Sequence, residues 1–140
     1  MQEIKKKKRA VALFVIVLIC LCGWWAVRKE GFFLDEIYSY GLANSSYAPF
    51  LNWYYNGEHS FDGNLPEAVF EQQDFVNYIS VQKNDRFNYA SVYYNQTQDI
   101  HPPLFYFLLN TVCSLFPGSF TKWTCLGMNF VLLGGTLAAL

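Results

Sequence analysis

Two short clusters of polar residues in this 140-residue chain could together carry out chemistry on a hydroxyl group. The first is the pair Asp35 and Glu36, and the second contains Asp99 and His101. A carboxylate within hydrogen-bond reach of a hydroxyl can take its proton and so make the oxygen a nucleophile. Neighbouring helical residues point about 100° apart, so Asp35 and Glu36 cannot both face one acceptor. Only one of the two could therefore act on a given acceptor, and the other would support it.

The same residues have simpler structural interpretations, which the sequence leaves open. Asp35 and Glu36 in the first turn of a helix would suit the helix dipole without any chemical role. His101 precedes Pro102, a favoured first residue of a helix, and could simply be the residue before that helix. Asp35, Asp99 and His101 could also hold a divalent metal ion, although the proposed step needs none in principle and we predict no cofactor.

The elements that position these clusters are predicted to be membrane helices. The chain is 53% apolar and only 15% charged, and five basic residues, Lys5 to Arg9, precede an uncharged stretch, residues 10–27. As a helix, this stretch would extend about 27 Å, close to the roughly 30 Å of hydrocarbon that a span must cross. A cleaved signal peptide is the alternative, but it needs small residues before its cleavage site, where Trp24 stands. We therefore predict an uncleaved anchor.

Two further apolar stretches, residues 104–117 and 123–140, predict a second and a third span. The expected fold is all-α, with about three transmembrane helices in the cell membrane. Basic residues place the amino-terminal tail, 1–9, and the turn at Lys122 on the cytoplasmic side. Residues 28–103 then form a long extracytoplasmic loop. Because the last apolar stretch runs to the final residue, we expect one block of a longer protein.

The predicted outer loop has its own features. Its first short helix should cover residues 32–44, and a second should run from 65 to about 78. It contains ten acidic and four basic residues, which argues against nucleic acid or an anionic membrane surface as its partner. Residues 53–55, Trp-Tyr-Tyr, suggest an interfacial surface. Asn44 and Asn95 begin triplets that match glycosylation acceptors.

The two polar clusters also carry a family resemblance. Phe33-Leu34-Asp35-Glu36 after a first span, a long outer loop, and Asp99-Ile100-His101-Pro102-Pro103-Leu104-Phe105-Tyr106 opening the second span resemble family 39 and the protein O-mannosyltransferase branch of the C-type glycosyltransferases. Residues 86–92, Arg-Phe-Asn-Tyr-Ala-Ser-Val, together with Asn95-Gln96, are similar to the bacterial members. The resemblance implies a mannosyltransferase-like enzyme. It would move a sugar from a polyprenyl-phosphate donor to a hydroxyl or similar acceptor on the extracytoplasmic face, with inversion.

The resemblance also implies roles for individual residues. It makes Asp35 the base, and we predict Glu36 as its orienting or hydrogen-bonding partner. Asp99, His101 and Tyr38 are assigned to substrate binding, of the donor phosphate or the acceptor. Members of the family carry many more spans, so this chain alone is expected to be inactive. The alternative is a non-catalytic multi-pass membrane protein, either an accessory subunit or an outward-facing binding module.

Overall fold

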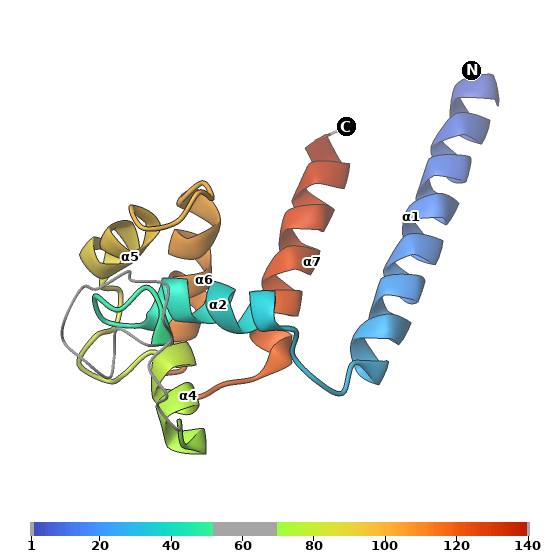
Figure 1. Ribbon diagram of the computed structural model, residues 1–140. Helices are drawn as coiled ribbons and strands as arrows, with labels where there is room; N and C mark the ends of the chain where they lie inside the picture. The colour runs from blue at the N-terminus through green and yellow to red at the C-terminus, as the bar shows by residue number, and fades with distance from the viewer. Residues whose placement is uncertain (1, 52–69, 140) are drawn as a thin grey trace. The chain divides into compact units, whose positions relative to one another are not determined.

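The computed structural model describes residues 2–51 and 70–139, and the regular structure within these ranges is entirely helical. The prediction of an all-α chain is therefore confirmed. The chain divides into two compact units, Met1–Gly31 with Asn129–Leu140, and Phe32–Met128. The helices drawn in Figure 1 are α1 (Gln2–Arg28), α2 (Leu34–Asn44), α4 (Gln72–Ile79), α5 (Tyr89–Gln96), α6 (Leu104–Leu115) and α7 (Lys122–Ala139).

Helix α1 is longer than the predicted span, because the basic residues before it continue the same helix. Its segment Arg9–Arg28 is the one stretch of the described residues that is both long and apolar enough to cross a membrane. Its side chains are largely exposed, which suits a membrane anchor and also suits a signal sequence near an amino terminus. Helix α6 has 12 residues, so it is about 18 Å long and shorter than the hydrocarbon core.

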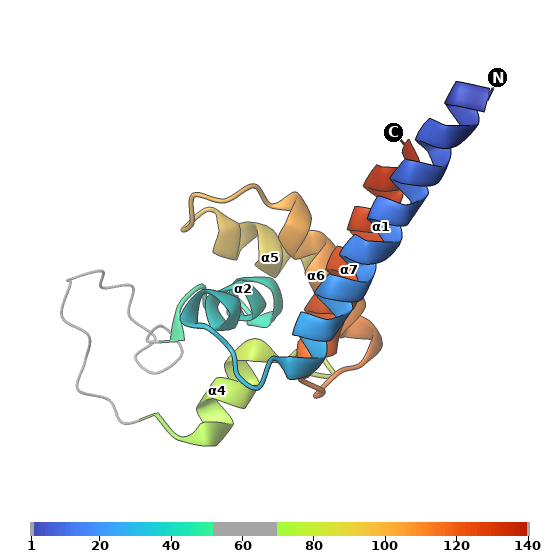
Figure 2. The same cartoon turned by 90° about the vertical axis from the view of Figure 1, so that its right-hand side faces the viewer.

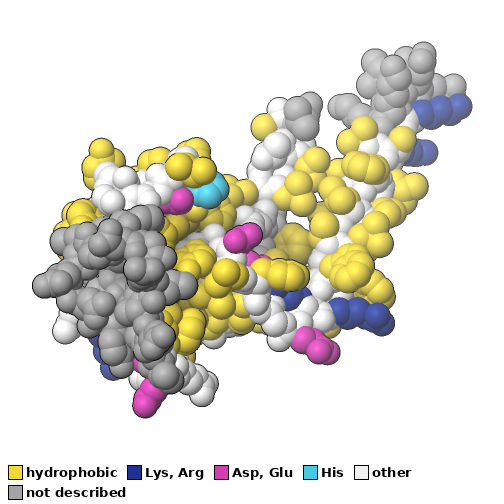
Figure 3. All heavy atoms as spheres, viewed as in Figure 1, with side chains coloured by type: hydrophobic (Ala, Val, Ile, Leu, Met, Phe, Trp, Pro, Cys, Tyr) yellow, Lys and Arg dark blue, Asp and Glu magenta, His cyan; other side chains and the backbone are white. Residues whose placement is uncertain are grey.

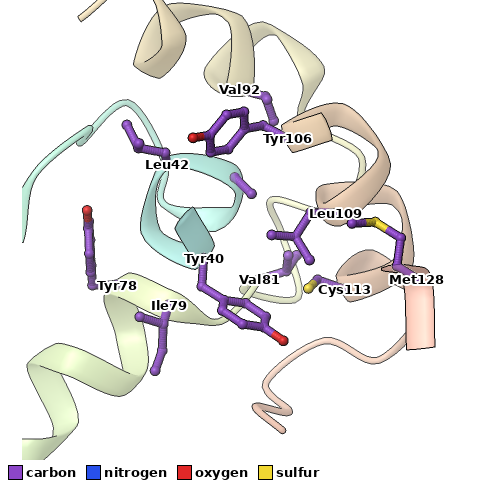
Figure 4. Packing of buried hydrophobic residues seen from close by; sticks show 11 residues of the cluster. Tyr40, Leu42, Tyr78, Ile79, Val81, Val92, Tyr106, Leu109, Cys113 and Met128 are labelled. Carbon is purple, nitrogen blue, oxygen red and sulfur yellow. The ribbon is translucent and has the colours of Figure 1, made fainter. Parts of the chain in front are cut away.

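The second unit has a continuous apolar core around α2, which packs against α4, α5 and α6 (Figure 2). Tyr78 and Leu109 are completely buried in it. Figure 4 shows how side chains from different helices converge there. The buried members of the cluster are Tyr40, Leu42, Ala43, Tyr78, Ile79, Val81, Val92, Tyr106, Leu109, Cys113 and Met128.

Close contact between α2 and α4 depends on a glycine. A Cβ atom added at Gly41 would overlap the ring of Tyr78. That ring cannot move aside freely, because its hydroxyl donates a hydrogen bond to the Pro49 carbonyl oxygen at 2.7 Å. Burial raises the pKa of Tyr78, so its hydroxyl remains protonated and able to donate.

The carboxyl-terminal end of α2 is buried, and side chains from two other helices supply its missing donors. The last carbonyls of any helix lack partners within the helix. Here the Asn95 amide donates to the Leu42 carbonyl oxygen at 3.2 Å and to the Ser45 carbonyl oxygen at 2.9 Å. The Asn110 amide donates to the Ala43 carbonyl oxygen at 2.8 Å. These bonds join α5 and α6 to the end of α2.

The residues that begin α7 are attached to α2 by a tyrosine. The Tyr40 hydroxyl donates to the Thr121 carbonyl oxygen at 3.0 Å and accepts from the Cys125 backbone N–H at 2.9 Å. Burial raises the pKa of Tyr40, which keeps this hydroxyl in the form that can donate. One side chain therefore fixes the turn between α6 and α7 against the core.

Some predictions about the loop need correction. Helix α5 was not predicted. Asn44 and Asn95 are buried at 5% and 0% exposure, so neither can be a glycosylation acceptor in the folded chain. The second short helix is present from Gln72 to Ile79, while its predicted start at 65 and the aromatic cluster at 53–55 lie outside the described residues.

Substitution of Gly41 by alanine should destabilise the second unit by about 1–3 kcal/mol, because the added methyl group overpacks the contact with Tyr78. Alanine normally favours a helix interior over glycine by about 1 kcal/mol, so a loss would identify the contact as its cause. Gly127→Ala is the matched control, since an added Cβ there meets no atom within 4 Å. Thermal unfolding in detergent measures both variants. Equal stability of Gly41→Ala and the parent would contradict the close approach.

Asn110→Ala should lower the free energy of unfolding by about 1–3 kcal/mol, because the buried Ala43 carbonyl oxygen would lose its donor. The exposed Asn84 provides the control: Asn84→Ala should change stability by no more than about 0.5 kcal/mol. Chemical unfolding followed by circular dichroism compares the two variants. If both behave alike, the capping role of Asn110 is wrong.

Candidate active site

A cavity of about 650 Å³ opens in the second unit, within the size range of small-molecule sites. It lies between the amino-terminal half of α2 and the segment that leads into α6. Four of the five predicted site residues line it together. The described residues around it are Asp35, Tyr38, Ser39, Leu42, Phe50, Asp99, His101, Pro102, Phe105 and Tyr106.

Helical spacing explains why α2 presents these groups on one side. Residues 35, 38, 39 and 42 are three, four and seven positions apart, so they share one helix face. At the start of the helix, the Glu36 carboxylate accepts from the Phe33 backbone N–H at 2.9 Å. Glu36 is the predicted site residue that does not line the cavity. Its hydrogen bond holds the first turn of α2, which also contains Asp35.

Asp99 and His101 form a hydrogen-bonded pair, with Asp99 Oδ2 and His101 Nδ1 2.8 Å apart. Burial by itself would raise the pKa of Asp99, but hydrogen bonds from His101 and from the Ile100 backbone N–H outweigh it and lower the pKa. Asp99 is therefore ionised at neutral pH. An ionised carboxylate next to Nδ1 favours a proton on that nitrogen, which leaves Nε2 for a ligand.

The two side chains of the pair differ in their exposure to solvent. The Asp99 side chain is 16% exposed and that of His101 is 62% exposed. Figure 3 shows a histidine beside an acidic side chain at the edge of an apolar surface. Tyr106, buried beneath the pair, interacts with Asp99 and with Ser39 of α2. The histidine is thus anchored through Asp99 to the packed interior.

Aromatic rings make up much of the remaining wall. The rings of Tyr38 and Phe50 meet edge to face with centroids 6.1 Å apart, and those of Phe105 and Tyr106 do so at 5.4 Å. The sequence-based prediction included only Tyr38 from this set. Helical spacing from Asp35 could have identified Ser39 and Leu42, whereas Phe50 reaches the cavity only through the fold.

The predicted alternative of a metal site is not supported by the arrangement of these side chains. Among the residues that the structure describes, no three of the His, Cys, Asp and Glu side chains are grouped as metal ligands. Asp99 and His101 are instead hydrogen-bonded to each other. The cavity can therefore offer a carboxylate at Asp35, an Asp99–His101 pair and an aromatic wall to a polar organic molecule.

Comparison with protein-family models, with curated proteins and with solved structures gives no match. What the site can do therefore follows from its own chemistry.

His101→Ala should raise the pKa of Asp99, because the hydrogen bond that most strongly favours its ionised form is removed. A carboxyl group whose pKa is lower in the folded state than in the unfolded chain stabilises the fold when the pH is above its unfolded-state pKa. This stabilisation is lost as the pH falls through the folded-state pKa. The variant should therefore lose less stability on acidification. Carbon-13 NMR titration of the Asp99 carboxyl group measures the shift. An unchanged pKa would contradict the Asp99–His101 contact.

Proposed function

We propose that this chain is the amino-terminal membrane part of a glycosyltransferase that works within a longer protein. It moves a sugar from a polyprenyl-phosphate donor to a hydroxyl or similar acceptor on the extracytoplasmic face. The proposal rests on one observation: Asp35 from α2 and the Asp99–His101 pair ahead of α6 line the same cavity. These are the two motifs on which the resemblance to the C-type glycosyltransferases rests.

The first span of the proposed membrane arrangement is α1, whose segment Arg9–Arg28 is long and apolar enough to cross a bilayer. Helix α6 is not a second span in this arrangement, because Tyr40, Val81 and Arg86 bond to the chain at or beyond its carboxyl-terminal end. With the basic amino terminus in the cytoplasm, Asp35 follows the outer end of α1. The cavity then opens on the outer side of the membrane, where a lipid-borne sugar is accessible.

In the proposed reaction, the Asp35 carboxylate accepts the proton of the acceptor hydroxyl. The acceptor oxygen forms a bond to the anomeric carbon of the sugar as the bond from that carbon to the lipid phosphate breaks. The lipid phosphate departs with the bonding electrons, and attack from the opposite face inverts the anomeric configuration. A positioned general base accelerates such a step by about 10²–10⁴-fold.

The other lining groups have binding roles in this scheme. The Asp99 carboxylate accepts hydrogen bonds from hydroxyl groups of the reacting compound, and His101 Nε2 does so as well when the ring proton is on Nδ1. Tyr38 and Phe105 provide flat apolar surfaces for the C–H faces of a sugar ring. A binding protein would use the same surfaces without a base, so loss of turnover with retained binding separates the two functions.

Asp35→Asn in the full-length protein should reduce transfer from radiolabelled polyprenyl phosphate mannose by at least about 100-fold, because the amide cannot take the proton. Binding of the donor should be nearly unchanged, since asparagine has almost the same shape. Asp85→Asn is the control, because Asp85 lies outside the cavity, where it accepts a hydrogen bond from Ser46. Membrane vesicles provide the assay, with transfer and binding measured on the same preparation. Full transfer by Asp35→Asn would remove this residue as the base.

A further inference from the structure

The charges around the cavity are unsuited to an anion. Two carboxylates, Asp35 and Asp99, line it, and the described lining residues include one histidine but no lysine or arginine. Phosphate sites are normally built from arginine, lysine or backbone N–H groups. A negatively charged group placed here would face two carboxylates.

The second unit has three basic residues, Lys83, Arg86 and Lys122, and none of them lines the cavity. Lys29 lies six residues before Asp35 and belongs to the other unit. Arg86 Nε donates to the Ser114 carbonyl oxygen at 2.7 Å, in the last turn of α6. The cavity is lined by Phe105 and Tyr106 in the first turn of this helix, about 12–14 Å from Ser114 along the helix axis. The backbone two residues before Lys83 is also bonded just after the carboxyl-terminal end of α6, where the Val81 carbonyl oxygen accepts from the Gly118 N–H at 2.8 Å.

Helix amino termini can bind an anion in place of basic side chains, but the two helices at the cavity have few free N–H donors in their first turns. The first turn of α2 already holds Asp35 and Glu36, and Glu36 occupies the Phe33 N–H. The segment entering α6 contains Pro102 and Pro103, which have no N–H to donate. Residues 52–69, outside the described ranges, also contain no lysine or arginine.

We infer that this cavity selects a hydroxyl compound that is uncharged or positively charged, that it excludes anions, and that Asp99 is the residue that sets this preference. The lipid phosphate of the donor is then held outside the cavity. The inference rests on the proposed function only in taking the occupant to be a sugar-like hydroxyl compound. Asp99 suits the role because His101 and the Ile100 N–H keep its carboxylate ionised at the cavity wall.

A matched series of sugars tests the preference without requiring turnover. The probes are methyl α-mannopyranoside, its 2-amino-2-deoxy counterpart, which is cationic at neutral pH, and its 6-phosphate. Binding to the full-length protein in phosphatidylcholine nanodiscs is measured by calorimetry at low and at high salt. The amino sugar should bind most tightly and the phosphate at least about tenfold more weakly than the neutral sugar. The difference should shrink as salt screens the charges.

Asp99→Asn should reduce the preference for the amino sugar over the neutral sugar by about five- to tenfold, the size of one nearby charge interaction. Asp85→Asn removes the same charge outside the cavity and should leave the preference intact. Equal or tighter binding of the phosphate, failure of all three probes to bind, or an unaltered preference in Asp99→Asn would each overturn the inference. A preserved charge preference in a protein without transferase activity would refute the proposed function alone.

Discussion

The buried carboxyl-terminal end of α2 is the constraint on which the second unit depends. Its final carbonyl groups are shielded from water, so they need donors from elsewhere in the chain. Asn95 and Asn110 supply them from α5 and α6. Because these amides reach their acceptors only when the three helices are in register, the bonds fix α5 and α6 relative to α2. The amino-terminal half of α2 and the start of α6 then line one cavity.

In this arrangement, the buried side chains that line the cavity come from the core, and the exposed polar side chains stand at its edge. Leu42 and Tyr106 line the cavity from the buried core, where packing leaves them little freedom. Asp35 and His101 stand at its exposed edge, where a substrate can reach them. Asp99 connects the two sets, since it is largely buried and hydrogen-bonded to His101. A rigid support beneath accessible polar groups is what positional catalysis requires.

Several helices could be predicted from the sequence because local patterns define them. Acidic residues mark the first turn of α2, and prolines and a glycine bound the apolar run of α6. Helix α5 could not be predicted, because it is buried through polar residues such as Asn95 and lacks an apolar face of regular spacing. The two motifs predicted the residues at the edge of the cavity. Phe50 could not be found in this way, since it approaches α2 only through the folded chain.

The most direct test asks whether residues 35 and 101 are close together and whether both can be reached from outside the cell. In full-length protein whose native cysteines are replaced by serine, the double variant Asp35→Cys/His101→Cys is treated in intact cells with a short, membrane-impermeant reagent that joins two thiols. An intramolecular cross-link in intact cells is the expected result, because both positions line one cavity, which we propose opens on the extracytoplasmic face. A cross-link that forms only after the membrane is opened, or none at all, would contradict the account.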